Sequence, residues 1–260
     1  MELAEERQLC DYEKKEQIRA RVDSIVENPE TTAKLKPYYN QFCKRPCLHD
    51  EYLQSFNVLI VQLVDTDGKG IDSISERGVI ANGIEYELDC LIYTTRFELA
   101  TDWTHRSGFE VTRTDGLPLS KKWENGASTL HGWTTRGFRN FFMGQILQAA
   151  LTPNFMHVTA YQAVHFVYVI SEARKRNIKT IQPTQEADDK WVQTILEFSK
   201  FREGFQKECT PGYYNNEGVP SLRLSRNSFY GGGPLKFLQI MEEWRLKGGL
   251  AGLKIEKFEQ

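Results

Sequence analysis

The sequence lacks an apolar run of about 20 residues, the length that a transmembrane helix requires. Its amino-terminal stretch, M-E-L-A-E-E-R-Q, is highly charged and contains no apolar segment of the kind found in secretory signals. It also lacks an excess of either charge, because 33 Lys and Arg residues are balanced by 35 Asp and Glu residues. We therefore expect a soluble, cytoplasmic protein, and neither a dedicated nucleic-acid binder nor a membrane-surface protein.

Cysteines are few, and the five that occur are odd in number and scattered along the chain. Such a set does not make a disulfide framework. Cys43, Cys47 and His49 are close enough in sequence to suggest zinc, but a fourth ligand at a suitable spacing is missing. We therefore expect ordinary thiols and no metal site.

Motifs for nucleotides and for serine nucleophiles are absent as well. The sequence contains neither Gly-x-Gly-x-x-Gly nor the P-loop pattern, and Gly231 to Gly233 follow no buried strand, so they are better interpreted as a turn. No Ser-centred nucleophile elbow occurs. These patterns therefore identify no reaction.

What is present is typical of a folded globular protein. The 260 residues are 40% hydrophobic and 12% aromatic, which is enough to bury a substantial core. No domain linker or internal repeat is evident. Periodicity and turn signals predict an α/β or α+β fold. In the first half the expected elements are a helix from about Leu3 to Glu27 ended by Asn28-Pro29, a strand at Val58–Val64 buried on both faces, a hairpin of Gly78–Ala81 and Ile84–Leu88 around Asn82-Gly83, and a buried strand at Cys90–Tyr93.

The second half is richer in helical patterns. We expect Trp103–Trp123 to be mostly loop, Phe138–Met143 to be a strand, Gly144–Pro153 a loop, His157–Lys175 a helix, Thr184–Phe201 a helix capped by Thr184, Glu203–Ser228 a long functional loop, and Leu235–Lys247 a last helix. The strand, loop and helix between Phe138 and His157 match the arrangement in which α/β folds bind ligands, although a plain connector would have the same pattern.

One loop, Cys43 to Asn57, places Lys44 and Arg45 directly before Pro46. The proline disfavours helical backbone at Arg45, so the arginine should lie on an extended segment. A guanidinium held in this way can stabilise an oxyanion. Without further context, a solvated surface pair is the more common arrangement.

Several motifs in collinear order cover nearly the whole chain. They are K-R-P-C-L-H-D-E-Y-L-Q-S-F-N at 44–57, V-D-T at 64–66, E-L-D-C-L-I-Y at 87–93, S-G-F-E at 107–110, L-H-G at 130–132, R-G-F-R-N at 136–140, E-C-T-P-G-Y-Y-N-N-E-G at 208–218 and Y-G-G-G-P at 230–234. Together they closely resemble the flavin-dependent Baeyer–Villiger monooxygenases.

The resemblance implies an α/β fold, namely the C-terminal part of the FAD domain in a flavoprotein with two dinucleotide-binding domains, with a β-hairpin or meander and C-terminal helices. Residues 1–260 would form a single partial domain. It would consist of a helix and catalytic-arginine loop at 1–57, a sheet portion at 58–145, and a helical and loop portion at 146–260.

The resemblance also implies the chemistry. NADPH reduces FAD, oxygen adds to give a peroxyflavin, and a ketone is converted to an ester or lactone, while the protein orients the cofactor and excludes water. Arg45 carries over as the catalytic arginine, with Lys44 beside it. Further residues carry over as cofactor-binding, namely Gly144, Asn154, Phe155 and Thr95, and as part of a loop that closes over NADPH and substrate, namely Tyr213, Tyr214 and Asn216.

The sequence departs from the family in what it does not contain. The two glycine fingerprints and the carboxylate that pairs with the arginine belong to a preceding part of the family polypeptide, and Arg96 stands where the family has glycine, which allows close backbone approach. We therefore expect a truncated form or one part of a split enzyme that needs a separate N-terminal half or a homologous monooxygenase chain. A non-catalytic module that binds a partner or small molecule, and an enzyme without redox chemistry, are the alternatives.

Overall fold

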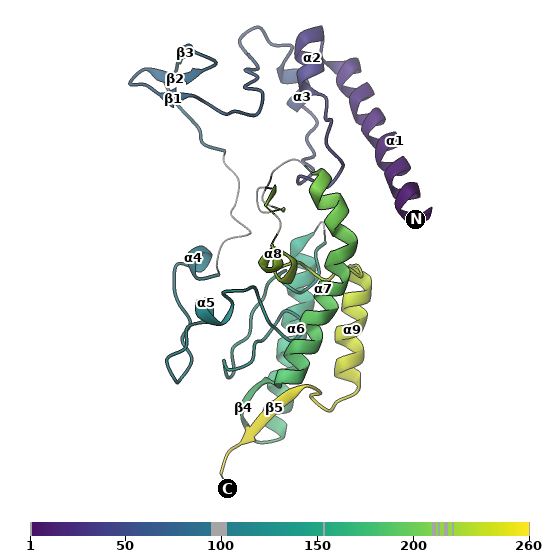
Figure 1. Cartoon of the computed structure of the whole chain (residues 1–260), viewed down its shortest axis with the longest axis vertical. Helices are drawn as coiled ribbons and strands as arrows, with labels where there is room; N and C mark the ends of the chain where they lie inside the picture. Colours follow the sequence, from purple (N-terminus) through teal and green to yellow (C-terminus); the bar gives the residue numbers. More distant parts are fainter. Residues whose placement is uncertain are drawn as a thin grey trace. The chain divides into compact units, whose positions relative to one another are not determined.

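A computed structural model describes residues 2–94, 103–152, 154–209, 212, 214–215, 218–219 and 221–259 (Figure 1). The chain divides into two compact units, Met1–Phe97 and Glu98–Gln260. Within the described ranges, no helix has the length and apolar character needed to cross a membrane.

The first unit begins with three helices, α1 (Glu2–Ile25), α2 (Pro29–Leu35) and α3 (Tyr52–Ser55). Asn28 separates α1 from α2, because its Oδ1 accepts hydrogen bonds from the backbone N–H groups of Glu30 and Thr31, both at 3.0 Å. Pro29 occupies the first turn, where its missing N–H costs nothing. The predicted first helix and its end at Asn28-Pro29 are confirmed.

The same unit contains a three-stranded antiparallel sheet of β1 (Ser73–Ile74), β2 (Gly78–Ala81) and β3 (Ile84–Glu87), in the order β1-β2-β3. Ala81 pairs with Ile84, so Asn82 and Gly83 form the two-residue connection. Their φ angles of 53° and 74° are both positive, as a type I′ hairpin turn requires. The hairpin predicted at Asn82-Gly83 is confirmed.

Two predicted strands of this unit are wrong. Residues 58–64 and 90–93 form no strand, and the side chains of Leu59 and Ile60 are 103% and 92% exposed. A continuous apolar run suits a strand that is covered on both faces. The described part of the first unit supplies neither neighbouring strands nor covering layers for these segments, so a correct local pattern does not become a strand.

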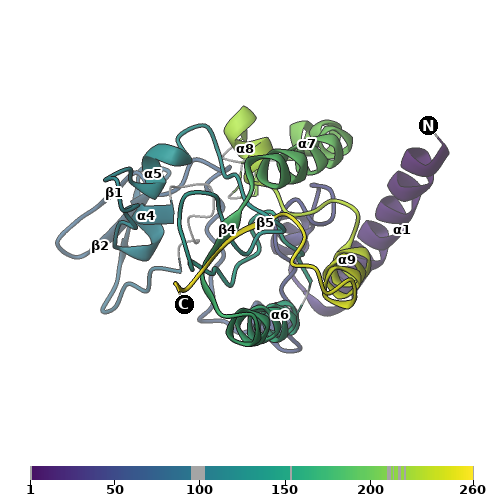
Figure 2. The ribbon, with the colours of Figure 1, turned by 90° about the horizontal axis from the view of Figure 1, so that it is seen from below.

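The second unit consists mainly of α6 (Phe155–Lys175), α7 (Gln185–Glu208) and α9 (Pro234–Leu246), with β4 (Ile178–Pro183) paired antiparallel to β5 (Leu253–Lys257). The three long helices run side by side (Figure 1) and, seen end-on, stand around a common interior (Figure 2). Short helices α4 (Trp103–Ser107), α5 (Leu119–Lys122) and α8 (Leu222–Arg226) complete it. The core includes Trp133, Val169, Ile195, Phe237, Met241 and Trp244.

The predictions for this unit hold for its long helices. The Oγ1 of Thr184 accepts a hydrogen bond from the backbone N–H of Ala187 at 3.2 Å and caps α7 as expected. The expected strand at Phe138–Met143 is wrong: the segment is irregular, although Phe138 and Met143 are buried. The predicted loop at Glu203–Ser228 is wrong at both ends, since α7 continues to Glu208 and α8 occupies residues 222–226.

Two histidines lie inside the aromatic core of the second unit. His165 is fully buried, and neither of its ring nitrogens has a hydrogen-bond partner among the described residues. Its ring centroid lies 5.0 Å from that of Trp133 and 4.9 Å from that of Trp244. Burial lowers the pKa of His165 to about 3 and that of His131 to about 4, so both rings are neutral at pH 7.

We expect the chain to lose stability as the pH falls from 6.5 toward about 4. Because the pKa of each histidine is lower in the folded state than in the unfolded state, the unfolded state takes up more protons in this range. The stabilisation is therefore fully present above pH 6.5, and each histidine contributes a slope of up to about 1.4 kcal/mol per pH unit. Urea unfolding measured across this range checks the slope.

His165→Leu should reduce that slope, while His157→Leu, at an exposed position of the same helix, serves as the matched control. An identical slope in the wild type and in His165→Leu would contradict the assignment.

Candidate functional site

The loop that leads to Arg45 is held against α1 on its amino-terminal side. Three charged side chains of α1 form the attachment, and each bonds a different residue of the segment 37–41. The bonds join Asp11 Oδ1 to Gln41 N (2.7 Å), Lys15 Nζ to Asn40 Oδ1 (3.0 Å) and Arg19 Nε to the carbonyl oxygen of Pro37 (2.9 Å). Lys15 is buried and also pairs with Asp11 at 2.9 Å, which fixes two of these groups further.

Arg45 and Lys44 themselves are exposed. The Nζ of Lys44 lies 5.1 Å from the ring centroid of Tyr39, within the range of a cation–π interaction. In the described part of the chain, the guanidinium of Arg45 forms no ion pair or hydrogen bond. The structure therefore leaves the side chain available to an anion, on a loop whose start is fixed.

The predicted flavin loop is fixed by α6. Gln162 is 1% exposed, and its side chain amide forms two bonds with one residue: its Oε1 accepts from Gln145 N at 3.1 Å and its Nε2 donates to Gln145 O at 2.8 Å. Gly144, directly before, is exposed, and the nearest atom to a Cβ added there would be 3.9 Å away. The backbone at Gly144 is therefore both held in place and open to an approaching group.

Asn154 and Phe155 lie where α6 begins. Asn154 is the N-cap residue, yet its side chain forms no capping hydrogen bond, and Phe155 is 43% exposed. Gln162 lies seven residues after Phe155, roughly 10 Å along the helix axis. The same helix therefore anchors the loop at Gln145 and carries the exposed residues at its own start.

The remaining predicted site residues are described only in part. Thr95, Tyr213 and Asn216 lie outside the described residues, and Tyr214 is half-buried. Asn215, which sequence reasoning missed, is buried and organises this loop: its Oδ1 accepts from the N–H groups of Gly212 (2.9 Å) and Gly218 (3.1 Å), and its Nδ2 donates to Cys209 O at 3.3 Å. Its position between two glycines was a usable signal, because Asn side chains often bond nearby backbone groups in turns.

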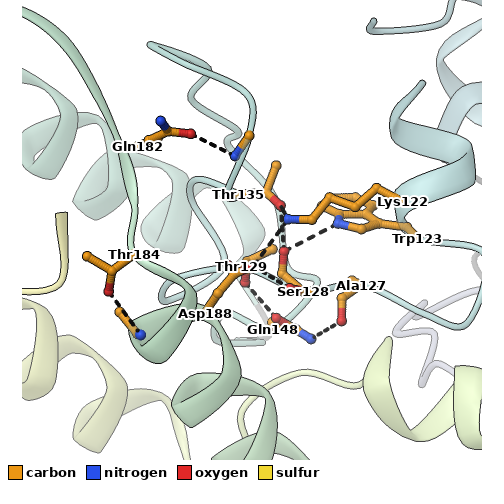
Figure 3. Close-up of polar contacts among 12 residues, drawn as sticks. Lys122, Trp123, Ala127, Ser128, Thr129, Thr135, Gln148, Gln182, Thr184 and Asp188 are labelled. Carbon is orange, nitrogen blue, oxygen red and sulfur yellow. Dashed lines mark hydrogen bonds and ion pairs between the residues drawn. The ribbon is translucent and has the colours of Figure 1, made fainter. Parts of the chain in front are cut away.

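A network of buried polar groups joins residues 119–135 to α7 (Figure 3). The Nζ of Lys122 lies 3.1 Å from Oδ2 of Asp188, and the exposed fractions of these side chains are 13% and 2%. Ser128 Oγ donates to the same carboxylate oxygen, and Lys122 also donates to Thr135 Oγ1. Thr135 Oγ1 in turn donates to Ser128 O at 2.6 Å. Burial lowers the pKa of Lys122, and the charge of Asp188 opposes that effect.

Gln148 forms a second part of the network. It is fully buried with φ at 55°, in the left-handed region. Its Oε1 accepts from Thr129 Oγ1 at 2.6 Å, and its Nε2 donates to the carbonyl oxygens of Ala127 and Arg226, both at 2.8 Å. The predicted flavin loop is thus fixed at Gln145 by α6 and at Gln148 by these groups. Sequence reasoning missed Gln148, Gln162, Lys122 and Asp188, since their partners are distant in sequence.

This arrangement positions backbone rather than performing chemistry. Its charged groups are enclosed and pair through Oδ2 of Asp188, while Oδ1 of the same carboxylate is buried without a hydrogen-bond partner among the described residues. Across the described ranges, no group of three or more His, Cys, Asp or Glu side chains could hold a metal ion. Among the predicted site residues that the structure describes, Arg45 in the first unit and Gly144, Asn154 and Phe155 in the second are exposed.

We expect Asp188→Asn to destabilise the chain by about 3–5 kcal/mol, because it removes the carboxylate from the buried ammonium of Lys122. The double variant Lys122→Met/Asp188→Leu should recover most of that loss, since no buried charge remains. The measurement is the free energy of unfolding in urea.

Asp189→Asn, at the adjacent exposed position of α7, is the matched control and should change stability by less than about 0.5 kcal/mol. A similarly small effect for Asp188→Asn would show that the ion pair does not hold residues 119–135.

Comparison with known proteins identifies relatives for almost the entire chain. No family model matches the sequence. It is 47% identical over 253 residues to Baeyer-Villiger monooxygenase ATR8 of Stachybotrys chlorohalonatus, covering 97% of this chain and 40% of that protein. It is 44% identical over 255 residues to pentalenolactone D synthase of Streptomyces exfoliatus, covering 97% of this chain and 43% of that protein. The chain therefore spans about two fifths of the length of these curated relatives.

Solved structures give the same result. A polycyclic ketone monooxygenase from Thermothelomyces thermophila superimposes with a TM-score of 0.88 at 35% identity, over 95% of this chain and 40% of that chain. A closed structure of cyclohexanone monooxygenase has a TM-score of 0.78 at 26% identity, over 94% of this chain and 44% of that chain. These neighbours support the predicted α/β class.

Proposed function

Since this chain is a homologue of the Baeyer–Villiger monooxygenases, as its motifs predict, we propose that it is part of an FAD- and NADPH-dependent enzyme that converts a ketone to an ester or lactone. The observation that carries the proposal is the similarity over 97% of the chain to proteins of that name, at 47% identity. Because the chain spans 40% of that relative, the activity requires the part of the relatives' sequence that this chain does not match.

The residues of this chain fit one part of an FAD site. Gly144 offers open backbone on a fixed loop, and Asn154 and Phe155 are exposed at the start of α6. With Thr95, these residues would hold the flavin ring. The sequence lacks the Gly-x-Gly-x-x-Gly pattern that cradles a pyrophosphate, so we assign that contact to the part of the family sequence that this chain does not match. When bound, FAD supplies electron transfer from NADPH and the activation of oxygen.

Arg45 is the proposed catalytic residue. Its guanidinium can stabilise negative charge that develops during oxygen transfer, because it presents several N–H donors in a rigid plane. Lys44, beside it, adds a second positive charge next to Tyr39. Tyr213, Tyr214 and Asn216 belong to the loop that closes over NADPH and substrate, and Asn215 orders the described part of that loop.

The domain organisation follows from the same proposal. Residues 1–260 form the C-terminal portion of the flavoprotein, with the helix and arginine loop at 1–57, a sheet portion at 58–145 and the helical portion at 146–260. The carboxylate that pairs with Arg45 and both dinucleotide-binding fingerprints belong to the part of the family sequence that this chain does not match. This assignment accounts for an arginine that has no carboxylate partner within the described part of its own chain.

A reconstitution experiment tests the function. We define the complementing fragment as the part of Baeyer-Villiger monooxygenase ATR8 that lies outside its match to this chain. This chain alone should remain colourless with added FAD. Co-expressed with the complementing fragment, it should purify as a yellow complex that oxidises NADPH in response to a ketone. A folded complex that ignores FAD would instead indicate a non-catalytic binding module.

In that complex, Arg45→Ala should lower ester formation by about 100-fold or more while NADPH still reduces the flavin, because only the anion-stabilising donor is lost. Product formation and flavin reduction are measured separately by chromatography and by absorbance. Arg21→Ala, which removes an exposed arginine of α1, is the control. Unchanged ester formation by Arg45→Ala would refute the role of this residue.

A further inference from the structure

Two buried aromatic residues of the second unit are bonded to consecutive residues of the predicted flavin loop. Trp191, on α7, is 5% exposed, and its indole Nε1 donates a hydrogen bond to the carbonyl oxygen of Gln148 at 2.9 Å. Tyr230 is 6% exposed, and its backbone N–H donates to the carbonyl oxygen of Ala149 at 2.7 Å. The loop therefore lies directly against this pair of residues.

The rings of Trp191 and Tyr230 are also stacked on each other. Their centroids are 5.4 Å apart and their planes differ by 16°, so the two π systems are in contact. The phenol oxygen of Tyr230 lies beside Gly232, where an added Cβ would be 2.5 Å from it, and Gly232 is exposed. The pair thus makes a path of ring contacts from the loop to an exposed turn.

The other ring neighbours of the pair are poor electron donors. Among the described residues, the ring of Trp191 also contacts those of His131 and Phe237, and the ring of Tyr230 contacts those of Phe198 and Phe237. Indole and phenol rings lose a single electron far more readily than phenyl or imidazole rings. An electron vacancy on Trp191 can therefore be filled from Tyr230, the easily oxidised ring that it touches.

The hydrogen bonds of the two residues suit this direction of transfer. The Nε1–H of Trp191 is bonded to an amide oxygen, which is too weak a base to remove its proton, so an oxidised indole keeps its positive charge. Burial raises the pKa of Tyr230, so its hydroxyl is protonated at pH 7. Because that hydroxyl lies beside an exposed glycine, its proton can pass to water when the ring is oxidised.

We propose that Trp191 and Tyr230 form an electron relay that carries oxidising equivalents away from the predicted flavin loop. A one-electron oxidant derived from oxygen takes an electron from Trp191 and is reduced. The Trp191 radical cation takes an electron from Tyr230, whose hydroxyl proton goes to water. A thiol in solution then gives the tyrosyl radical one electron and one proton and becomes a thiyl radical, so both side chains are restored. This inference rests on the proposed function, in which a flavin that activates oxygen is the source of the oxidant.

Pulse radiolysis of the isolated chain tests the transfer without flavin. Azide radicals oxidise tryptophan, and transient absorption should then show the tryptophan radical decaying as a tyrosyl radical appears, at a rate independent of protein concentration. Tyr230→Phe keeps the stacked ring and removes the phenol, so this phase should be lost. Tyr161→Phe is the matched control and should keep it, because the ring of Tyr161 lies on α6 against that of His157, 5.2 Å away.

A second variant and a second tyrosine make the result decisive. Trp191→Phe should also lose the phase, and its urea unfolding midpoint shows whether it folds; if it does not, Tyr230→Phe alone decides. A phase that persists in Tyr230→Phe, or no such phase in the wild type, would overturn the relay. So would a phase lost in Tyr168→Phe instead, which would assign the transfer to Trp244, whose ring centroid is 6.2 Å from that of Tyr168.

The consequence for the enzyme is measured in the yellow complex with the complementing fragment. With NADPH and oxygen but no ketone, Tyr230→Phe should lose activity in fewer turnovers than the wild type, while freshly prepared variant oxidises ketone at the wild-type rate. Equal lifetimes would refute the protective role and leave the proposed function intact. A complex that oxidises no ketone would refute the proposed function, whereas the transfer measured in the isolated chain does not depend on it.

Discussion

The order of the second unit depends on the burial of one carboxylate. Asp188 lies on α7 at 2% exposure, and a charge in that position is tolerated only when partners satisfy it. Lys122 and Ser128 supply partners for its Oδ2 from a segment that has little regular structure. These two bonds attach residues 119–135 to α7. Gln148 extends this principle to the flavin loop, with hydrogen bonds that reach both sides of it.

The first unit differs from the second in how its apolar side chains are placed. Its polar groups are well satisfied, as the bonds between α1 and residues 37–41 show, but its apolar runs at 58–61 and 88–93 are exposed. In the second unit, by contrast, apolar side chains are enclosed in an aromatic core, and the ring nitrogens of His165 within it have no hydrogen-bond partner among the described residues.

Local signals explain which parts of the fold could be predicted. Thr184 caps α7 through a residue three positions away, and Asn82-Gly83 sets a turn by its own backbone preferences. Val58–Val64 failed because a strand exists only with its neighbours, which no local pattern supplies. The residues of the candidate site also form two groups, those that local motifs predict and those whose bonding partners are distant in the sequence. Arg45 and Gly144 are predicted from family motifs, whereas Asp188 and Gln162 bond residues 60 and 17 positions away along the chain and gave no signal in the sequence.

Both loops of the candidate site are ordered by bonds within their own unit. The flavin loop is fixed at Gln145 and Gln148 by contacts within the second unit, and the arginine loop is attached to α1 within the first. Neither attachment needs a partner, so both loops exist before one binds. A ligand that binds at either loop therefore does not have to order the segment that these bonds already hold, which lowers the entropic cost of binding.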